Sequence, residues 1–493
     1  MGEDKKVARI IGSGIAAIAT SIRIAKKGYE VHVHEGNSYP GGKLSEIKLG
    51  KYRFDAGPSL FTLPENVDAL FELCGENPRD HFSYIKKEES CRYFWEDGKR
   101  LTAHSSIDKF VNEAEINLGE SSQAIRSHLS LAKKQYDSTS EFFLERSLHR
   151  LKTYLRFSIL KTILALPSLR LFSTMHGVHV KRFRTNHMVQ FFDRYATFNG
   201  SSPFKAPGIL CMIPHLEFGI GTFLPKKGMV DITNSLVALA KRQGVHFHFN
   251  EKVTKIISND KKVNGLSVEK NKKDVIFSSD IVVSNMDVTP TYRKLLSYLP
   301  EPSRILSQEP SSSALIFYWG INEKFPEFNL HNILFSKDYK TEFDSLFNSK
   351  TLNDDPTVYI NITSKDLPQD APKNCENWFV MINVPSNNGQ DWDLIRKKAR
   401  QLIIDKIHKI TRRDISSLIE CEDYLDPRRI QSRTSSEKGS LYGSSSNSVF
   451  SAFFRHPNQK ALKNLYFCGG SAHPGGGIPL CLLSARIVSD AIR

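Results

Sequence analysis

Residues 7–17 read Val-Ala-Arg-Ile-Ile-Gly-Ser-Gly-Ile-Ala-Ala, and this stretch decides the fold. Its first five residues predict a short buried strand, and the small and apolar residues after the glycines predict a helix. Between strand and helix runs a Gly-x-Gly-x-x-Ala pattern made by Gly12, Gly14 and Ala17. The first glycine permits a tight turn, the second lets the backbone approach a pyrophosphate, and the alanine is small enough for close packing of helix on strand.

A second strand at residues 30–35 completes the unit. Its last residue, Glu35, stands 23 positions after Gly12, where a carboxylate can accept hydrogen bonds from ribose hydroxyls. A diphosphate would lie at the N-terminus of the helix, because free N–H groups and the helix dipole favour anions there. Strand, glycine turn, helix and carboxylate together predict a dinucleotide site. The alternative is a glycine-rich turn of structural use alone.

Length and composition bound the remaining possibilities. The chain has 493 residues, 40% of them hydrophobic, which suits two or three interleaved domains with sizeable cores. Its seven cysteines are scattered without a C-x-x-C pair, so we expect no metal site and no disulfide framework. Scattered thiols fit a reducing cytoplasm. The N-terminal residues lack the apolar region and cleavage site of a signal peptide, so none is expected.

Apolar runs and turn residues predict the other elements. Residues 105–200 read as mostly helical, and short strands follow from 253 to 287 with turns at Asn259-Asp260 and Asn264-Gly265. Apolar runs within 311–385 suit a mixed or antiparallel sheet. The elements expected from residue 230 onward are a helix at 230–242, strands at 245–249, 314–321, 358–362 and 378–384, a helix at 392–412, a strand at 464–468 and a helix from about 478 to the end.

The net charge of +15 is concentrated in one segment. Residues 145–184 hold nine Lys or Arg against one acidic residue, and they are also rich in Leu, Ile and Phe. That mixture favours an anionic membrane surface over nucleic acid, which we do not expect as a partner. Lys161 and Pro167 interrupt the apolar run, so a spanning helix is not expected. The alternative is a pair of core helices with solvated arginines. At helical spacing the apolar arc is Leu148, Leu151, Leu155, Ile159 and Leu166, opposite Arg146, Arg150 and Lys161.

The segment after Glu35 carries a resemblance to a known family. It reads Gly36-Asn-Ser-Tyr-Pro-Gly-Gly-Lys43 and resembles the second signature of the amine-oxidase and phytoene-desaturase group of flavoproteins. The resemblance implies FAD as the cofactor, with Gly42 and Lys43 on its phosphate and ribose side. Lys43 stands where the group more often has Arg, so it offers a point charge without the bidentate fork. A solvated lysine is the alternative.

Two further motifs resemble the carotenoid desaturases of this group. Residues 53–59, Arg-Phe-Asp-Ala-Gly-Pro-Ser, match a turn that passes beside the flavin ring, and residues 469–479 resemble the Gly-x-x-x-His-Pro-Gly-x-Gly-Ile-Pro motif of bacterial-type phytoene desaturases. The glycines would let the backbone lie against a flat ring, and the helix after them would point its positive end at the flavin pyrimidine. The expected cofactor-binding residues are Gly12, Gly14, Ala16, Ala17, Glu35, Gly42, Lys43, Gly57, Pro58, Ser59, Val253, Gly470, Gly477, Ile478 and Pro479.

The resemblance implies an α/β fold in which a Rossmann-type FAD-binding domain is joined to a mixed-sheet substrate domain and a helical membrane-associating region. The expected parts are residues 1–105 (first FAD-binding part), 106–200 (helical substrate and membrane-associating region), 201–295 (second FAD-binding part and connecting strands), 296–455 (substrate domain) and 456–493 (C-terminal FAD-binding part).

The family removes hydrogen from carbon–carbon single bonds of polyenes, passing a hydride to the flavin while a neighbouring carbon loses a proton. Because conjugation spreads the developing charge, the protein needs to supply little beyond orientation and a dry tunnel. The candidate catalytic residues are Glu217, Asp193 and His473. Asp193 could instead pair with Arg194 or Arg182, Glu217 could instead cap a turn, and His473 could serve in packing or positioning.

Residues 52–64, Tyr-Arg-Phe-Asp-Ala-Gly-Pro-Ser-Leu-Phe-Thr-Leu-Pro, are most similar to the hydroxycarotenoid 3,4-desaturases of the group. This implies an FAD-dependent enzyme acting on a hydroxylated or partly cyclised carotenoid. The alternatives are a phytoene desaturase, a carotenoid isomerase that uses reduced FAD, and a non-catalytic flavin-bound escort protein. The expected location is cytoplasmic, peripherally bound to the inner face of the cell membrane, with oxygen or a quinone as the electron acceptor.

Overall fold

A parallel five-stranded sheet joins the N-terminal, middle and C-terminal parts of the chain in the computed structural model, which describes residues 5–154, 164–270 and 272–492. The strand order is β19-β13-β1-β2-β9, and every neighbouring pair is parallel. The inner strands are apolar because both faces of the sheet are covered. The strands are β1 (Val7–Ile11), β2 (Glu30–His34), β9 (His246–His248), β13 (Ile281–Ser284) and β19 (Leu465–Phe467).

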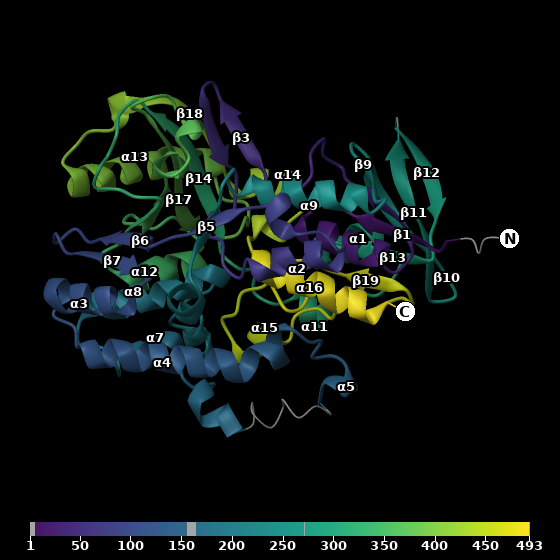
Figure 1. Cartoon of the computed structure of the whole chain (residues 1–493), viewed down its shortest axis with the longest axis horizontal. Coiled ribbons are helices and arrows are strands. Elements are labelled where there is room, and N and C mark those ends of the chain that lie inside the picture. The colour runs from purple at the N-terminus through teal and green to yellow at the C-terminus, as the bar shows by residue number, and fades with distance from the viewer. Residues whose placement is uncertain (1–4, 155–163, 271, 493) are drawn as a thin grey trace.

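Helices cover one face of this sheet and a small antiparallel sheet covers the other (Figure 1). The helix α1 lies at the centre of the helical layer, against α2, α9 and α16. The predicted helix at 230–242 is confirmed with the same bounds. The covering elements are α1 (Ile15–Ala25), α2 (Glu65–Leu73), α9 (Val230–Arg242), α16 (Ile478–Ala491), β10 (Lys252–Asn259), β11 (Lys262–Lys270) and β12 (Lys273–Ser278).

One of the two predicted turns in this region is wrong. The turn at Asn259-Asp260 forms, since it joins β10 to β11. Asn264 and Gly265, however, lie inside β11, where the pairing register with β10 shifts by one residue. Such a bulge favours the same residue types as a turn. A Cβ on Gly265 would come within 2.3 Å of the Phe277 carbonyl oxygen, so the glycine serves a close strand contact.

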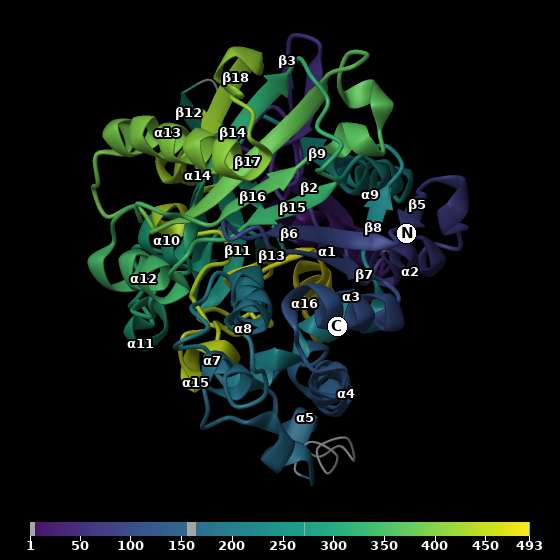
Figure 2. The same ribbon diagram turned by 90° about the vertical axis from the view of Figure 1, so that its left-hand side faces the viewer.

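A seven-stranded mixed sheet forms the second layer of the molecule, as the apolar runs predict. Its order is β18-β14-β17-β16-β15-β6-β7, and β15 with β6 is its parallel pair. Helix α13 packs on its outer face (Figure 2). Its last two strands come from residues 89–104, within the part assigned above to FAD binding. The elements are β6 (Glu89–Phe94), β7 (Arg100–His104), β14 (Ser313–Ile321), β15 (His331–Leu334), β16 (Val358–Asn361), β17 (Glu376–Val384), β18 (Ile419–Leu425) and α13 (Trp392–Thr411).

Helices between residues 107 and 193 pack together at the edge formed by β6 and β7 (Figure 1). They are α3 (Ile107–Leu118), α4 (Ser122–Thr139), α7 (Met175–His179) and α8 (Asn186–Asp193). The short helix α5 (Leu151–Tyr154) lies away from that edge (Figure 1). Among the described residues, no helix is both long and apolar enough to cross a membrane. The remaining short elements are β3 (Glu46–Leu49), β4 (Tyr52–Asp55), β5 (Tyr84–Lys86), β8 (Phe223–Pro225), α10 (Val288–Pro290), α11 (Ser303–Leu306), α12 (Tyr339–Asp344), α14 (Pro427–Thr434) and α15 (Val449–Phe453).

A charged cluster at the end of β4 connects the helical layer of the five-stranded sheet with the seven-stranded sheet. The buried Asp55 carboxylate accepts hydrogen bonds from the Met229 and Val230 amides, at 2.9 and 3.1 Å, where α9 begins. Arg53 contacts Asp55 at 2.5 Å and also Asp370, which follows the seven-stranded sheet's β16, at 3.1 Å. The cluster therefore fixes the start of α9 and one contact between the sheets.

Replacing Asp55 with Ala should lower the free energy of unfolding by about 3–5 kcal/mol, because it removes a partner of the nearly buried Arg53 and the acceptor at the start of α9. Urea denaturation followed by circular dichroism measures the loss. The control is Asp137→Ala, which breaks an exposed pair with Lys133 and should cost less than about 1 kcal/mol. Equal losses in the two variants would contradict the role given to Asp55.

Candidate functional site

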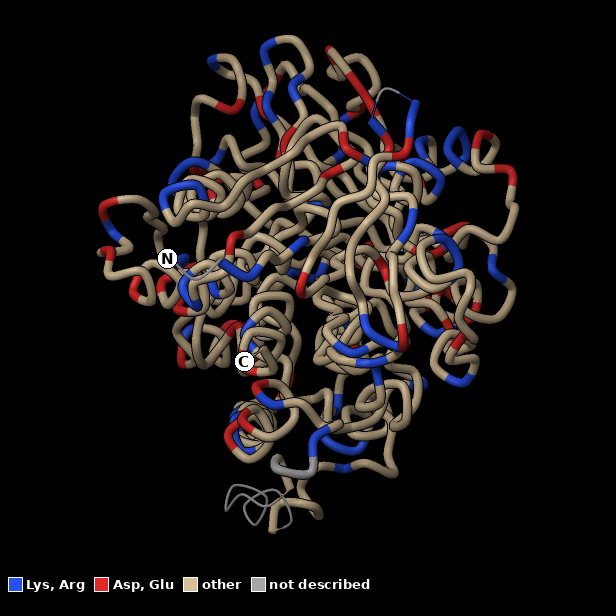
Figure 3. Tube along the Cα trace, turned by 90° about the vertical axis from the view of Figure 1, so that its right-hand side faces the viewer, with Lys and Arg blue, Asp and Glu red and all other residues tan. Residues whose placement is uncertain are grey.

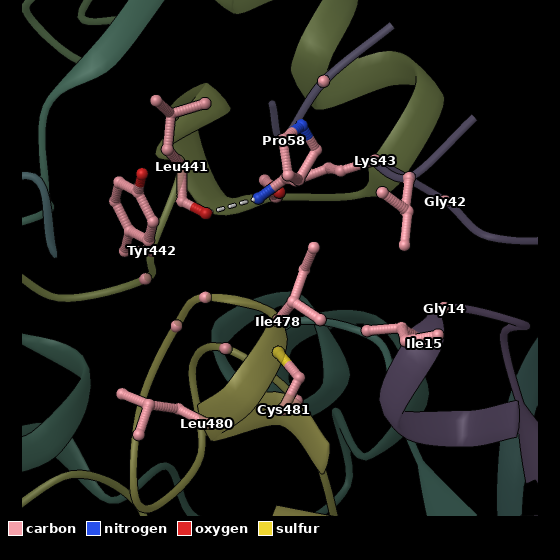
Figure 4. Close-up of a pocket in the computed structure, with 18 of the residues that line it drawn as sticks. Gly14, Ile15, Gly42, Lys43, Pro58, Leu441, Tyr442, Ile478, Leu480 and Cys481 are labelled. Atoms are coloured by element: carbon pink, nitrogen blue, oxygen red, sulfur yellow. Dashed lines mark hydrogen bonds between the residues drawn. The ribbon is translucent and has the colours of Figure 1, made fainter. Parts of the chain in front are cut away.

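A single elongated cavity of about 800 Å³ runs between the carboxyl ends of the parallel strands and the inner face of the seven-stranded sheet. One part is walled by the glycine-rich turns and the start of α16 (Figure 4). The other part extends between β6, β15, β16 and residues 194–217. Its length and its two different ends suit a large cofactor together with a second, long ligand.

The turn at Gly12 and Gly14 lets a ligand approach the backbone closely. The Gly12 amide donates to the His34 carbonyl at 2.8 Å, which holds the turn against the end of β2. A Cβ on Gly14 would lie 2.5 Å from the Asn285 side-chain oxygen, so a larger residue does not fit. Gly14 caps α1, whose first turn holds no acidic residue. Free amides at such a helix start, with no competing carboxylate, are a site for phosphate oxygens.

Glu35 holds this turn in place as well as facing the cavity. One carboxylate oxygen accepts from the Ser13 amide at 2.7 Å and the Ser13 hydroxyl at 2.8 Å. The other accepts from the amide and the side-chain nitrogen of Asn37, both at 2.9 Å. Two of these donors, the Ser13 hydroxyl and the Asn37 side chain, are able to rotate away. The carboxylate is thus oriented by two backbone amides and is available to ribose hydroxyls.

Lys43 links two turns across the cavity. Its Nζ donates to the carbonyls of Ser440 at 3.1 Å and Leu441 at 2.8 Å (Figure 4). Burial lowers the pKa of this ammonium group, with Asp287 opposing the shift. The Lys43 carbonyl in turn packs on Gly57, where a Cβ would lie only 2.1 Å away. Lys43 is therefore a half-buried tether between residues 57 and 441, which corrects the alternative of a solvated lysine.

The C-terminal glycine loop rests on a buried arginine. Arg455 donates to the Tyr442 carbonyl at 2.9 Å, the Gly470 carbonyl at 3.3 Å and the Ser444 carbonyl at 3.0 Å. Burial lowers the pKa of Arg455 to about 10. The loop then leads into α16, whose first residues line the cavity. A flat ring system placed on this loop would have a buried cation and the positive end of a helix dipole nearby.

Two of the three catalytic candidates lie away from the cavity wall. Asp193 is buried between His176, at 2.7 Å, and His179, at 2.6 Å. His179 also contacts the Cys211 thiol at 3.3 Å. Burial opposes protonation of His179, but Cys211 and Asp193 together raise its pKa to about 9. Asp193 therefore neutralises a histidine in the helical core instead of facing the ligand.

His473 takes part in positioning. Its Nε2 donates to the Arg146 carbonyl at 2.6 Å, and burial lowers its pKa to about 4. Its own carbonyl accepts from Asn458 at 2.8 Å and Ser484 at 2.9 Å. These bonds fasten the C-terminal loop to residue 146 and to α16. Pro474, and not His473, lines the cavity.

Glu217 is the catalytic candidate that does line the cavity. It is buried, accepts from the Ser90 hydroxyl at 2.5 Å and lies 3.5 Å from an Arg194 nitrogen. Arg194 also donates to the Tyr93 hydroxyl at 2.6 Å. These groups form a polar patch on a wall that is otherwise largely apolar.

A hydrogen-bonded chain that the sequence did not reveal lies beside this patch. Asn361 donates through its side-chain nitrogen to His331 Nδ1 at 3.1 Å, so Nδ1 is an acceptor. The Tyr359 hydroxyl, 2.7 Å from the same nitrogen, must then donate to it, and Ser59 donates to Tyr359 at 2.7 Å. Burial lowers the pKa of His331 to about 3, which leaves a neutral ring with its proton on Nε2. No local pattern joins residues about 300 positions apart.

The expected cofactor residues converge on one end of the cavity. Ala17 is the exception, since it is buried inside α1, where its small size serves helix packing. Val253 and Glu35 line the cavity together with the first glycine turn, and Ile478 lines it together with the C-terminal loop. The predicted residues that line the cavity are Gly12, Gly14, Ala16, Glu35, Gly42, Lys43, Gly57, Pro58, Ser59, Val253, Gly470, Gly477, Ile478 and Pro479.

Two substitutions test this placement of FAD. Glu35→Ala should weaken binding by about 1.5–3 kcal/mol, through loss of a charged acceptor. Gly14→Val should weaken it more, because the side chain meets Asn285 and fills the phosphate path. Titration of the apoprotein with FAD, followed by fluorescence, measures both. Glu30→Ala, at the other end of β2, is the matched control and should bind FAD normally. Unchanged FAD binding by Gly14→Val would place the cofactor elsewhere.

Comparison with solved structures supports the fold. An oxidoreductase from Methanosarcina mazei superposes with a TM-score of 0.64 at 13% identity, covering 98% of this chain and 100% of that one. Cyclohexylamine oxidase from Brevibacterium oxydans superposes with a TM-score of 0.61 at 14% identity, covering 99% and 100%. At these identities the likeness concerns the fold, and it confirms the predicted α/β class.

Sequence comparison gives closer relatives. The chain is 51% identical over 488 residues to a 1-hydroxycarotenoid 3,4-desaturase of Flavobacterium sp. (strain P99-3), covering 99% of each protein. It is 30% identical to a 4,4'-diapolycopene oxygenase of Methylomonas sp, covering 98% of this chain and 97% of that protein. The sequence model of the family described as flavin containing amine oxidoreductase matches residues 15–493. The predicted FAD cofactor is confirmed, and the chain belongs to the flavin-containing amine oxidoreductase family.

Proposed function

We propose that this enzyme desaturates the C3–C4 bond of a 1-hydroxycarotenoid. The observation that carries the proposal is the 51% identity, over 99% of both chains, to a relative named for that reaction. The elongated cavity supports it, because it leaves room for a long ligand beyond the cofactor residues. Apolar side chains suited to a polyene lie along it, namely Leu60, Leu63, Leu210, Ile213 and Leu216.

The reaction removes a hydride from one carbon and a proton from its neighbour, and bound FAD supplies the two-electron acceptor. The residues of the chain bind and orient the polyene and keep water out, which is the main requirement when the developing charge is delocalised. Oxygen or a quinone would then reoxidise the flavin.

We further propose that the enzyme docks on the inner face of the cell membrane. Residues 164–184 hold four Lys or Arg and no acidic residue, whereas basic and acidic residues are intermingled over most of the chain (Figure 3). Within this segment Leu164 is 82% exposed and Phe172 fully exposed. An exposed apolar pair beside basic residues suits the interface of an anionic bilayer. Leu166 of the predicted arc is exposed and Leu148 is buried, while Leu155, Ile159 and Lys161 lie outside the described residues.

The reaction is tested with purified enzyme and 1-hydroxycarotenoid in liposomes. The expected result is a red-shifted absorption spectrum with a product two mass units lighter, since one double bond is added to the conjugated system. Phytoene, supplied in parallel, should not be converted. An isomerised product of unchanged mass, or a product heavier by oxygen, would replace the proposal with an isomerase or an oxygenase.

Membrane docking is tested with the double variant Leu164→Ser/Phe172→Ser. Each side chain contributes at most about 1.5–3 kcal/mol when it leaves water, so binding to anionic liposomes should fall roughly ten- to a hundred-fold or more. Co-sedimentation measures it. The control is Ile276→Ser, which removes an apolar side chain that is 71% exposed on β12 and should bind as wild type does. Identical binding by all three proteins would exclude docking through this segment.

A further inference from the structure

We propose that Arg194 and Glu217 form a docking site for the hydroxyl group of the substrate, and that this contact sets which carbon–carbon bond faces the flavin. The inference rests on the proposed function and adds the residues that select a hydroxylated carotenoid. Both side chains line the cavity, although Arg194 is only 8% exposed and Glu217 only 4%. A buried ion pair is unexpected on the wall of a cavity for a hydrocarbon, because desolvating two charges is costly. Its presence there indicates a function in binding.

Arg194 keeps a donor without a partner. One terminal nitrogen donates to the Tyr93 hydroxyl at 2.6 Å. The rings of Tyr93, Tyr195 and Phe198 surround the guanidinium, with centroids 5.1, 4.7 and 5.1 Å from its central carbon. Nε is buried and has no hydrogen-bond partner among the described residues. The aromatic rings thus hold the guanidinium in place. Nε is too enclosed to meet a ligand, but the second terminal nitrogen makes no hydrogen bond to the described residues and stays available.

The Glu217 carboxylate can accept further hydrogen bonds. One of its oxygens accepts from the Ser90 hydroxyl at 2.5 Å. The other lies 3.5 Å from Arg194, and the Tyr195 hydroxyl lies beside the carboxylate without a hydrogen bond of normal geometry. A carboxylate has about four acceptor sites, so Glu217 can still accept from a ligand. An alcohol is one donor and one acceptor, and it would complete both Glu217 and the free N–H of Arg194. A hydrocarbon end group would leave both unpaired.

The position of the patch fits a role in setting register. Ser90, which bonds to Glu217, is the second residue of the strand β6, and β6 pairs with β15, whose first residue is His331. From His331 the hydrogen-bonded chain continues through Tyr359 to Ser59, next to the turn expected beside the flavin. The hydroxyl carbon of the proposed substrate, C1, is separated from the reacting C3 by one carbon. Holding the hydroxyl therefore fixes the C3–C4 bond along the cavity.

The test compares one carotenoid with and without its 1-hydroxyl group. We expect wild type to favour the hydroxylated form in kcat/KM. Glu217→Gln should reduce this preference roughly ten- to a hundred-fold, mainly through KM, because the charged acceptor is lost. The matched control is Glu342→Gln. Glu342 is an equally buried carboxylate that accepts from Ser336 and Thr357 at 2.7 Å without lining the cavity, so its substitution should leave the preference unchanged.

Each outcome decides the proposal. A fall in kcat for both carotenoids without loss of preference would make Glu217 a proton acceptor or a structural residue and overturn the docking site. Conversion by wild type of both carotenoids with equal efficiency would overturn it too, while the desaturase function would stand. The same ratio is measured for equilibrium binding, by quenching of protein fluorescence. A binding preference that Glu217→Gln abolishes would support docking even if no desaturation were observed, in which case the proposed function alone fails.

Discussion

Two cations, the buried Arg455 and the half-buried Lys43, donate to backbone carbonyls around the cavity and hold its walls together. Lys43 joins the turn after β2 to residues 440 and 441, and Arg455 joins residues 442 and 444 to Gly470. The cavity walls come from the two ends and the middle of the chain, so no continuous element positions them. Hydrogen bonds from a charged donor are stronger than those between neutral groups, and Lys43 and Arg455 both bind carbonyls of residues 440–444. They add this segment to the glycine turns that the parallel sheet already aligns.

The parts of the fold that follow from local pattern were predictable. The helix α9 has the predicted bounds, and β1, α1 and β2 follow from Gly12, Gly14 and Glu35, because each of these residues meets a requirement of its own turn or strand. Long-range pairing was not predictable in the same way. Residues 89–104 join the seven-stranded sheet through a parallel pairing of β6 with β15, more than 200 positions away, and nothing local distinguishes that partner. At Asn264 and Gly265 a bulge and a turn share the same residue types, so composition alone could not separate them.

The same distinction between local pattern and long-range pairing applies to the residues of the candidate site. Motif residues for the cofactor converge, because the glycines and Glu35 act through their own backbone or through near neighbours. Residues that act through partners distant in the sequence could not be predicted. Asp193 was expected to accept a proton or to pair with an arginine, but it binds two histidines. His331 contacts residues of β16, which only folding places beside it. A carboxylate or imidazole changes its chemistry with whatever surrounds it, and that surrounding is a property of the tertiary structure.

The bond from His473 to the Arg146 carbonyl has a thermodynamic consequence. A second contact, between Arg486 of α16 and Glu145 at 2.9 Å, lies beside it in sequence. The start of the basic segment is therefore joined to the C-terminal glycine loop at one point and to α16 at another. A motion of residues 145 and 146 must either break or keep these contacts. Its free energy therefore depends on the conformation of the loop and of α16. Coupling of this kind is reciprocal: whatever free energy a change in the segment contributes to the loop and α16, the same change in the loop and α16 contributes to the segment.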